Sequence, residues 1–336
     1  MRLLITGGLG FIGSNFIRHI RGKYPTYQIL NLDKKTYAGN PENLKDLARQ
    51  GNYRWIRSDI TCRRTVDSCM KKVDAVVHFA AESHVDRSIF SPAEFLKTNI
   101  FGTQVLLEAA RKYRIQRFIH VSTDEVYGSL ERGFAKEEDP LRPNSPYAAS
   151  KASADHLVRA YHKTHQLPAV ITRSSNNFGP YQFPEKVIPL FITNALTGQK
   201  LPLYGDGLHV RDWLFVSDHC KALDRVLHHG LPGEIYNIGG SKMCPNSELT
   251  RTILHLMGKP QSLTQHVPDR PGHDRRYALD CGKIQRELGW KPETPFEEAL
   301  RFTIRWYQEN KTWWAKIKGR KPYQTYYKKQ YTTLLS

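Results

Sequence analysis

The glycine-rich stretch near the amino terminus constrains the fold of this chain more than any other feature. A short apolar run, 2–6, leads into Gly7-Gly-Leu-Gly10-Phe-Ile-Gly13, and an amphipathic helical pattern follows to about residue 21. Glycines at these places permit a tight turn, close approach of the backbone to a pyrophosphate, and tight packing of a helix on a strand. A glycine pattern alone is weak evidence, but its place between a strand and a helix makes it specific. The stretch therefore predicts the phosphate-binding turn of a dinucleotide site.

An acidic residue at the end of the next strand-like run indicates which dinucleotide is bound. The run 28–32 ends at Asp33, about 20 residues beyond Gly13, where an acid can bind the ribose hydroxyls and repel a 2′-phosphate. We therefore predict NAD as the cofactor. Lys34 and Lys35 follow directly and keep NADP open as the alternative.

The order of the remaining runs predicts the architecture. Apolar runs at 53–57, 74–80, 117–121 and 169–172 alternate with helical patterns that include 97–113 and 147–165. This alternation predicts an α/β chain with a doubly wound parallel sheet of the Rossmann type. After residue 172 the regular alternation of strands and helices gives way to a loop rich in proline, aromatic and amide residues. The run 234–239 is predicted to be a strand that returns to the main sheet. We expect a nucleotide-binding domain (1–172 plus about 211–240), a smaller interleaved α/β substrate lobe (173–210 plus 241–318), and a basic, aromatic surface tail (319–336) that is loosely held.

Polar and acidic residues follow the strand 117–121, at the edge where open α/β sheets bind ligands. Thr123, Asp124 and Glu125 stand there, and a helical pattern places Tyr147 and Lys151 on one face. We expect the Lys151 ammonium to lower the pKa of Tyr147 and to make it a base near neutral pH. Thr123 can hydrogen-bond the same reacting oxygen, and the carboxyl pair can deliver one proton and remove another. With the dinucleotide motif, these groups favour an enzyme over a cofactor-bound sensor.

Charge and composition limit the other classes of protein. The formal net charge of +18 would suit a nucleic-acid binder, but the charge is spread along the chain and no nucleic-acid motif accompanies it. We expect no nucleic-acid partner and a basic surface that attracts an anionic substrate. No run of about 18 apolar residues exists to span a bilayer, so we expect no membrane association. Five scattered cysteines without a Cys-x-x-Cys pair predict free thiols, a cytoplasmic location and no metal site.

Several longer motifs carry a resemblance to a known family. They are Thr-Gly-Gly-x-Gly-Phe-Ile-Gly (6–13), Phe-Ala-Ala-Glu-Ser-His-Val-Asp-Arg-Ser (79–88), Ser-Thr-Asp-Glu-Val-Tyr-Gly (122–128), Ser-Pro-Tyr-Ala-Ala-Ser-Lys (145–151), Ser-Asn-Asn-Phe-Gly-Pro-Tyr-Gln-Phe-Pro-Glu-Lys (175–186), Tyr-Gly-Asp-Gly…Arg-Asp-Trp (204–213) and Asp-Arg-Pro-Gly-His-Asp-Arg-Arg-Tyr (269–277). Together they resemble the extended short-chain dehydrogenase/reductase superfamily and, within it, the nucleoside-diphosphate-glucose 4,6-dehydratases. The resemblance runs from residue 1 to about 318.

The resemblance implies an NAD-dependent hydro-lyase of a deoxysugar pathway, of the rhamnose type. It implies dTDP-glucose as the substrate, with UDP-glucose as the alternative and a nucleotide-sugar 4-epimerase as the more distant one. Asp124 followed by Glu125 fits the glucose dehydratases, because the epimerases lack this pair. The segment 242–246 departs from the usual family pattern where the nucleotide would lie, which keeps the choice between thymine and uracil open.

The resemblance also implies roles for individual residues. Tyr147 would take the proton of the glucose 4-hydroxyl, Glu125 the C5 proton, and a protonated Asp124 would donate to the departing 6-hydroxyl, with Thr123 and Lys151 completing the catalytic set. The residues implied to hold the cofactor are Gly7, Gly10, Phe11, Ile12, Gly13, Asp33, Asp59, Ile60, Ala80, Ala81, Thr98, Tyr147, Lys151 and Asn177. Those implied to contact the substrate are Ser83, His84, Thr123, Asn176, Glu185, Lys186, Tyr204, Arg211, Asn246, Arg270 and His273. The family pairs two copies through helices that here span 97–113 and 147–165, which implies a homodimer.

Overall fold

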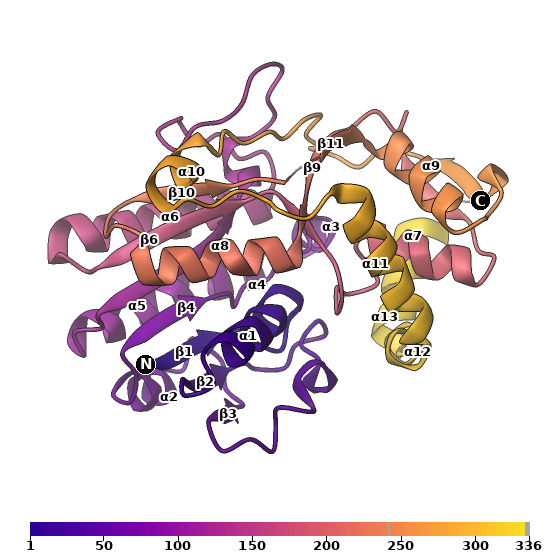
Figure 1. Cartoon of the computed structure of the whole chain (residues 1–336). Helices are drawn as coiled ribbons and strands as arrows, with labels where there is room; N and C mark the ends of the chain where they lie inside the picture. Colours follow the sequence, from indigo (N-terminus) through magenta and orange to yellow (C-terminus); the bar gives the residue numbers. More distant parts are fainter. Residues whose placement is uncertain (241, 333–336) are drawn as a thin grey trace.

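A seven-stranded, wholly parallel sheet forms the centre of the computed structural model, which describes residues 1–240 and 242–332 (Figure 1). The strand order is β10-β6-β5-β4-β1-β2-β3. The strands are β1 (Arg2–Thr6), β2 (Gln28–Leu32), β3 (Tyr53–Ile56), β4 (Ala75–His78), β5 (Arg117–Thr123), β6 (Ala169–Ser174) and β10 (Ile235–Ile238). The order reverses between β1 and β4, which creates the crevice where such sheets bind nucleotides. The predicted doubly wound sheet is confirmed, including the return of the 234–239 run beside β6.

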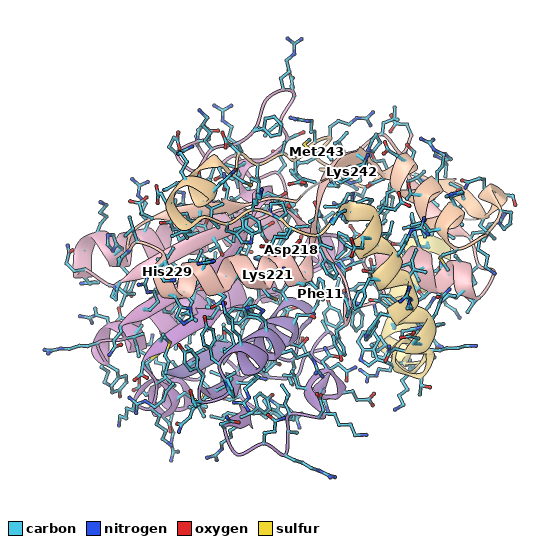
Figure 2. The ribbon with its side chains drawn as sticks, in the orientation of Figure 1. Phe11, Asp218, Lys221, His229, Lys242 and Met243 are labelled. Atoms are coloured by element: carbon cyan, nitrogen blue, oxygen red, sulfur yellow. The ribbon has the colours of Figure 1, made fainter. Side chains whose placement is uncertain are left out.

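Helices cover both faces of this sheet because its strands are apolar on both sides. Leu3 and Ile5 of β1 pack in one core with α1 (Phe11–Lys23) and α8 (Val216–His229). Leu4 faces the other core, which includes α2 (Arg63–Met70), α5 (Thr103–Lys112) and α6 (Pro146–His165). Figure 2 shows α8, from Asp218 and Lys221 to His229, lying alongside α1, whose first residue is Phe11. The carboxyl ends of the strands are thus left open for a ligand.

The helix expected at 97–113 is interrupted by a π-helical turn, Leu96–Gly102, between α4 (Pro92–Phe95) and α5. Asn99 in this turn accepts a hydrogen bond from the backbone N–H of Glu82 at 2.9 Å and donates one to Ser150 at 2.8 Å. Insertions of this kind occur mainly at functional sites, and here the turn places Thr98 at the pocket described below.

The smaller lobe is interleaved with the sheet, as expected. It contains a three-stranded sheet, β11 (Lys242–Pro245), β9 (Val210–Phe215) and β7 (Asn176–Phe178), and a parallel pair, β8 (Leu201–Tyr204) and β12 (Thr264–Val267). We expected the nucleotide-binding domain to resume at about residue 211. Instead, β9 pairs within the small three-stranded sheet, and the chain rejoins the nucleotide-binding core at α8. The other helices are α3 (Val85–Phe90), α7 (Val187–Leu196), α9 (Asn246–Leu256), α10 (Gly282–Leu288), α11 (Phe296–Glu309), α12 (Lys311–Lys318) and α13 (Lys321–Tyr327), with short turns of helix at Pro41–Leu44, Asp124–Tyr127, Gln261–Leu263 and Lys328–Thr332.

The carboxyl-terminal tail is packed onto the small lobe, which contradicts the expectation of a loosely held surface segment. α12 and α13 lie beside α7 and α11 (Figure 1), and Tyr323, Tyr326 and Tyr331 are buried. The Tyr323 hydroxyl donates to the carbonyl of Pro184 at 2.9 Å. Tyrosines at helical spacing bury one face of the tail, whereas Lys321, Lys328 and Lys329 stay exposed on the other. Residues 333–336 of the predicted tail lie outside the described residues.

Among the residues that the structure describes, no helix is both long enough and apolar enough to cross a membrane.

Candidate active site

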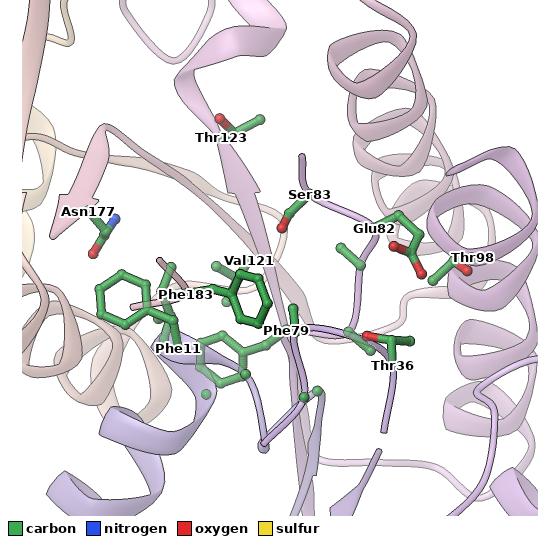
Figure 3. Close-up of a pocket in the computed structure, with 18 of the residues that line it drawn as sticks. Phe11, Thr36, Phe79, Glu82, Ser83, Thr98, Val121, Thr123, Asn177 and Phe183 are labelled. Carbon is green, nitrogen blue, oxygen red and sulfur yellow. The ribbon is translucent and has the colours of Figure 1, made fainter. Parts of the chain in front are cut away.

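A long pocket follows the carboxyl edge of the sheet at the β1–β4 crevice. Every residue predicted to hold the cofactor lines it, from Gly7 to Asn177, and so do all five predicted catalytic residues. Figure 3 shows Phe11, Phe183 and Asn177 on one side of the pocket and Glu82 and Thr98 on the other. The structure thus brings together residues from β1, β2, β5, α6 and β7, whose roles stay predictions.

The glycine turn fits a dinucleotide because it has no room for side chains. Gly7 has φ of +70°, in the left-handed region that favours glycine. A Cβ atom on Gly13 would lie 2.6 Å from the carbonyl oxygen of Gly7, and Gly10 caps the amino end of α1. The first N–H groups of this helix and its dipole favour an anion at this point. The turn therefore suits the pyrophosphate of NAD.

We expect Gly13→Ala to abolish retention of the dinucleotide. The added methyl group would clash with the Gly7 carbonyl oxygen and displace the turn from the phosphate path. The measurement is the NAD content of the purified protein. The matched control is Gly22→Ala in the same helix, where an added Cβ meets no heavy atom within 4 Å. Equal NAD content in the two variants would contradict this account of the turn.

Asp33 is fixed where it can receive the adenosine ribose. The backbone N–H groups of Leu9 and Lys35 donate to its two carboxylate oxygens at 3.0 and 2.7 Å. Burial raises the pKa of Asp33, and these backbone donors oppose that shift. The Lys34 ammonium lies 3.4 Å from Asp59 and 3.6 Å from Glu82, so acids compensate its charge. This arrangement suits ribose hydroxyls better than a 2′-phosphate.

The catalytic candidates meet where β5 and α6 approach each other. α6 begins at Pro146, and its Ser145 cap accepts a hydrogen bond from Ala148 N–H at 3.1 Å. Tyr147 and Lys151 therefore both lie in its first turns, buried, with the Lys151 ammonium donating to the carbonyl of Val121 at 2.7 Å. Thr123 accepts from the N–H of Glu125 at 3.3 Å, which fixes the turn of helix that carries the acidic pair.

The expectation that Lys151 lowers the pKa of Tyr147 is wrong for the pocket in this structure. Burial raises the pKa of the Tyr147 hydroxyl well above its usual range, and the neighbouring carboxylates of Glu125 and Asp124 raise it further, against a smaller opposing effect of Thr123. Burial also lowers the pKa of Lys151 to about 8, against the opposing attraction of Asp155. Desolvation is the largest effect on the pKa of both groups.

Burial raises the pKa of both members of the acidic pair. Burial raises the pKa of Asp124 well above its ordinary value, and the carboxylates of Glu125 and Asp212 raise it further. The surroundings of Asp124 therefore favour its protonated form more than those of an ordinary aspartate do. Burial also raises the pKa of Glu125, while the cations of Arg270, Lys186 and Arg211 oppose the shift. The two neighbouring carboxyl groups thus differ in their surroundings, as an acid and a base should.

The predicted substrate residues fall into two groups. Ser83, Thr123, Asn176, Glu185 and Lys186 line the pocket itself. The second group comprises His84, which precedes α3, and Tyr204, Arg211, Asn246, Arg270 and His273 of the small lobe. Because Arg270 and Arg211 influence the pKa of Glu125, these two members of the second group lie within electrostatic reach of the reaction centre.

Hydrogen bonds tie most of the second group together. Asp86 accepts from Arg270 at 2.5 Å and from the Tyr204 hydroxyl at 3.2 Å. His273 lies 2.6 Å from Asp269, which also lies 3.2 Å from His209. These last three residues could place ligand atoms around a metal, within 4.8 Å of one another. Burial and the cations of Arg270 and Arg211 lower the pKa of His273 to about 3, and the same cations disfavour a metal there.

Sequence reasoning missed Asp86 and the tail as parts of this site. The hydroxyl of Tyr326 lies 3.3 Å from Asp86, and the Gln330 amide donates to the Tyr204 hydroxyl at 2.6 Å. Asp86 stands inside the 79–88 motif, and the tail tyrosines have helical spacing, so both signals were present in the sequence. Only the packing of the tail shows that they meet.

A nucleotide-binding sheet with Tyr147 and Lys151 at its crevice defines an enzyme of the short-chain dehydrogenase/reductase class. The family model described as "GDP-mannose 4,6 dehydratase" matches residues 4–303. The chain is 53% identical over 323 residues to a dTDP-glucose 4,6-dehydratase of Streptomyces niveus, covering 95% of this chain and 96% of the relative. It is 46% identical over 349 residues to the Escherichia coli dTDP-glucose 4,6-dehydratase, and the match covers 94% of this chain and 96% of that relative.

Solved structures agree with these matches. The DesIV dTDP-glucose 4,6-dehydratase of Streptomyces venezuelae, with NAD and dTDP bound, superposes with a TM-score of 0.93 at 51% identity, over 94% of this chain and all of that one. A UDP-glucuronic acid 4-epimerase of Bacillus cereus has a TM-score of 0.87 at only 28% identity, and the match covers 92% of this chain and 99% of that one. The chain belongs to the dTDP-glucose 4,6-dehydratase family.

Proposed function

We propose that this chain converts dTDP-glucose to dTDP-4-keto-6-deoxyglucose and water, as a step of deoxysugar biosynthesis. The observation that carries the proposal is the buried Asp124–Glu125 pair beside Tyr147 at the end of a dinucleotide pocket. NAD, when bound, would supply an acceptor for the hydride of C4 and, in its reduced form, the hydride donor for C6. It would be held by the glycine turn, by Asp33, and by Tyr147, Lys151 and Asn177 at the other end of the pocket.

The first part of the reaction makes the C4 ketone. Tyr147 accepts the proton of the 4-hydroxyl as the hydride leaves C4, and Thr123 hydrogen-bonds the same oxygen. Lys151 is charged below its pKa of about 8 and stabilises the phenolate form of Tyr147, which is the form that accepts this proton. Burial of these groups excludes water from the ketone.

The second part removes water across C5 and C6. The ketone acidifies the C5 proton, which Glu125 takes, and Asp124 gives its proton to the departing 6-hydroxyl. After the hydride returns to C6, Glu125 returns its proton to C5. At this point Tyr147 has gained one proton and Asp124 has lost one. Transfer of that proton from Tyr147 to Asp124 through water restores both groups for the next turnover. An epimerase needs no such acid and base, which is why the pair favours a dehydratase.

The test is mass spectrometry of the purified protein incubated separately with dTDP-glucose and UDP-glucose, without an added electron acceptor. We expect loss of one water from the dTDP sugar. Loss from the UDP sugar alone would keep the mechanism and change the nucleotide. Unchanged mass together with conversion of glucose to galactose would replace the proposal with an epimerase.

A homodimer is also part of the proposal. Two large apolar side chains on the π-helical turn before α5, Leu96 and Phe101, are 49% and 45% exposed. They support pairing of two copies through α5 and α6, and analytical ultracentrifugation would measure the oligomeric state.

The five cysteines, Cys62, Cys69, Cys220, Cys244 and Cys281, are all free thiols, which supports the cytoplasm as the location.

A further inference from the structure

Arg87 is the point where four separate segments of the chain meet. It lies on α3, shortly after the 79–83 segment that lines the pocket. Its guanidinium contacts Tyr37, in the loop that follows Asp33; Glu185, in the loop before α7; and Tyr326, on the carboxyl-terminal α13. The roles proposed above leave this arginine unused.

Arg87 is the cation that hydrogen-bonds the Glu185 carboxylate, and the Lys186 ammonium interacts with the same carboxylate electrostatically. Nε and Nη2 of Arg87 both donate to the same oxygen of Glu185, at 3.2 and 3.1 Å. The Glu185 side chain is only 2% exposed, and an ionised carboxylate at such depth needs a cation and hydrogen bonds. His84 lies 3.9 Å from the other oxygen, but burial lowers its pKa to about 4, so it is neutral at physiological pH. Arg87 therefore fixes a side chain that lines the pocket.

Two aromatic rings hold the guanidinium in place. The central carbon of the Arg87 guanidinium lies 3.9 Å from the ring centre of Tyr37 and 4.4 Å from that of Tyr326. Tyr37 packs edge-on against Phe183, which lines the pocket, at 5.4 Å. Tyr326 is itself fixed, because its hydroxyl lies 3.3 Å from Asp86. A planar, delocalised cation suits stacking between two rings better than an ammonium does.

We propose that Arg87 is a positioning residue, which holds Glu185 against the sugar nucleotide and is itself held by Tyr326 of the carboxyl-terminal helix. The inference rests on the proposed function, because it takes the ligand of Glu185 to be the nucleotide sugar. It also gives the tail a definite role, since α13 supports the substrate pocket through one aromatic–arginine contact. Through Tyr37, the same arginine also joins the loop of Asp33 to the substrate lobe.

The test compares Arg87→Met and Arg87→Lys with wild type by steady-state kinetics on dTDP-glucose. We expect kcat/KM to fall about 10- to 100-fold in both variants, mainly through KM, because the fork of charged hydrogen bonds is lost. Tyr326→Leu should lower kcat/KM about threefold to tenfold, and Tyr326→Phe less, because the phenyl ring still stacks. NAD content should match wild type in every variant.

A double-mutant cycle separates positioning from general structural damage. If Arg87 acts through Glu185, then Arg87→Met in a Glu185→Gln background should cost less than about twofold beyond the single Glu185→Gln variant. The matched control is Arg18→Met. Arg18 also forks onto a carboxylate, that of Asp46, and stacks on Tyr181 at 5.1 Å, with a similar exposed fraction of 28% against 25%, but it does not line the pocket. Its kcat/KM should stay at the wild-type value.

Losses that add fully in the cycle, or a wild-type kcat/KM in Arg87→Met, would overturn the inference. If Arg87→Met fails to fold, Arg87→Lys and Tyr326→Leu decide in its place. If wild type does not dehydrate dTDP-glucose, the proposed function fails; the affinity of the same variants for that compound, measured by calorimetry, then tests the positioning role separately.

Discussion

The double variant Asp124→Asn, Glu125→Gln should oxidise dTDP-glucose but fail to dehydrate it. The amides keep the size of the side chains in a buried turn, but they can neither donate nor accept the protons of the elimination. Loss of one acid–base group costs about 10²–10⁴-fold in rate, so the removal of water should become undetectable. Because the carboxylates raise the pKa of Tyr147, their removal also makes that base easier to form. Reduced nicotinamide absorbance should therefore appear and persist, without a change in the mass of the sugar nucleotide beyond oxidation.

The control for this experiment is the neighbouring pair Glu138→Gln, Asp139→Asn. It makes the same chemical change on a loop that does not line the pocket. We expect both the oxidation at C4 and the loss of water to keep their wild-type rates. Dehydration at full rate in the Asp124/Glu125 variant would show that other groups carry the protons. Absence of any reduced nicotinamide would show that the pair is needed for oxidation as well.

Tyr147→Phe should block the reaction one step earlier. The phenyl ring keeps the edge-on contact with Phe95, at 6.3 Å in the wild type, so the pocket should keep its shape. Only the hydroxyl that accepts the proton of the 4-hydroxyl is lost, and we expect hydride transfer to slow by about 10²–10⁴-fold. The measurement is the single-turnover appearance of reduced nicotinamide, alongside the affinity for dTDP-glucose, which should change little.

The same substitution elsewhere on α6 provides the comparison. Tyr161→Phe removes a hydroxyl that bonds to Glu108, away from the pocket, and should leave hydride transfer at the wild-type rate. Rapid hydride transfer in Tyr147→Phe would show that another group, such as Thr123 with a bound water, removes the proton.

Sequence patterns predicted the parts of the site that lie close together along the chain. Gly7 to Gly13 form one turn, and Tyr147 and Lys151 share one helical face, so spacing alone places them. The packing of each strand end against its neighbours was also predictable, because alternating strands and helices permit few topologies. The pKa of Tyr147 could not be predicted from the sequence, because it depends on how deeply other segments of the chain bury the pocket. Adjacent residues suggested an activating ammonium, but desolvation proved the larger effect.

By itself, the sequence determined the nucleotide-binding sheet, the preference for a dinucleotide and the residue types of the reaction centre, because each depends on local periodicity or on motifs a few residues long. Only the tertiary structure decided that β9 joins the small sheet, that the basic tail is a buried support, and that Arg87 meets Tyr37, Glu185 and Tyr326. Those contacts join segments far apart along the chain. Many alternative pairings of such segments satisfy the same local pattern, and only the packing of the whole core selects one of them.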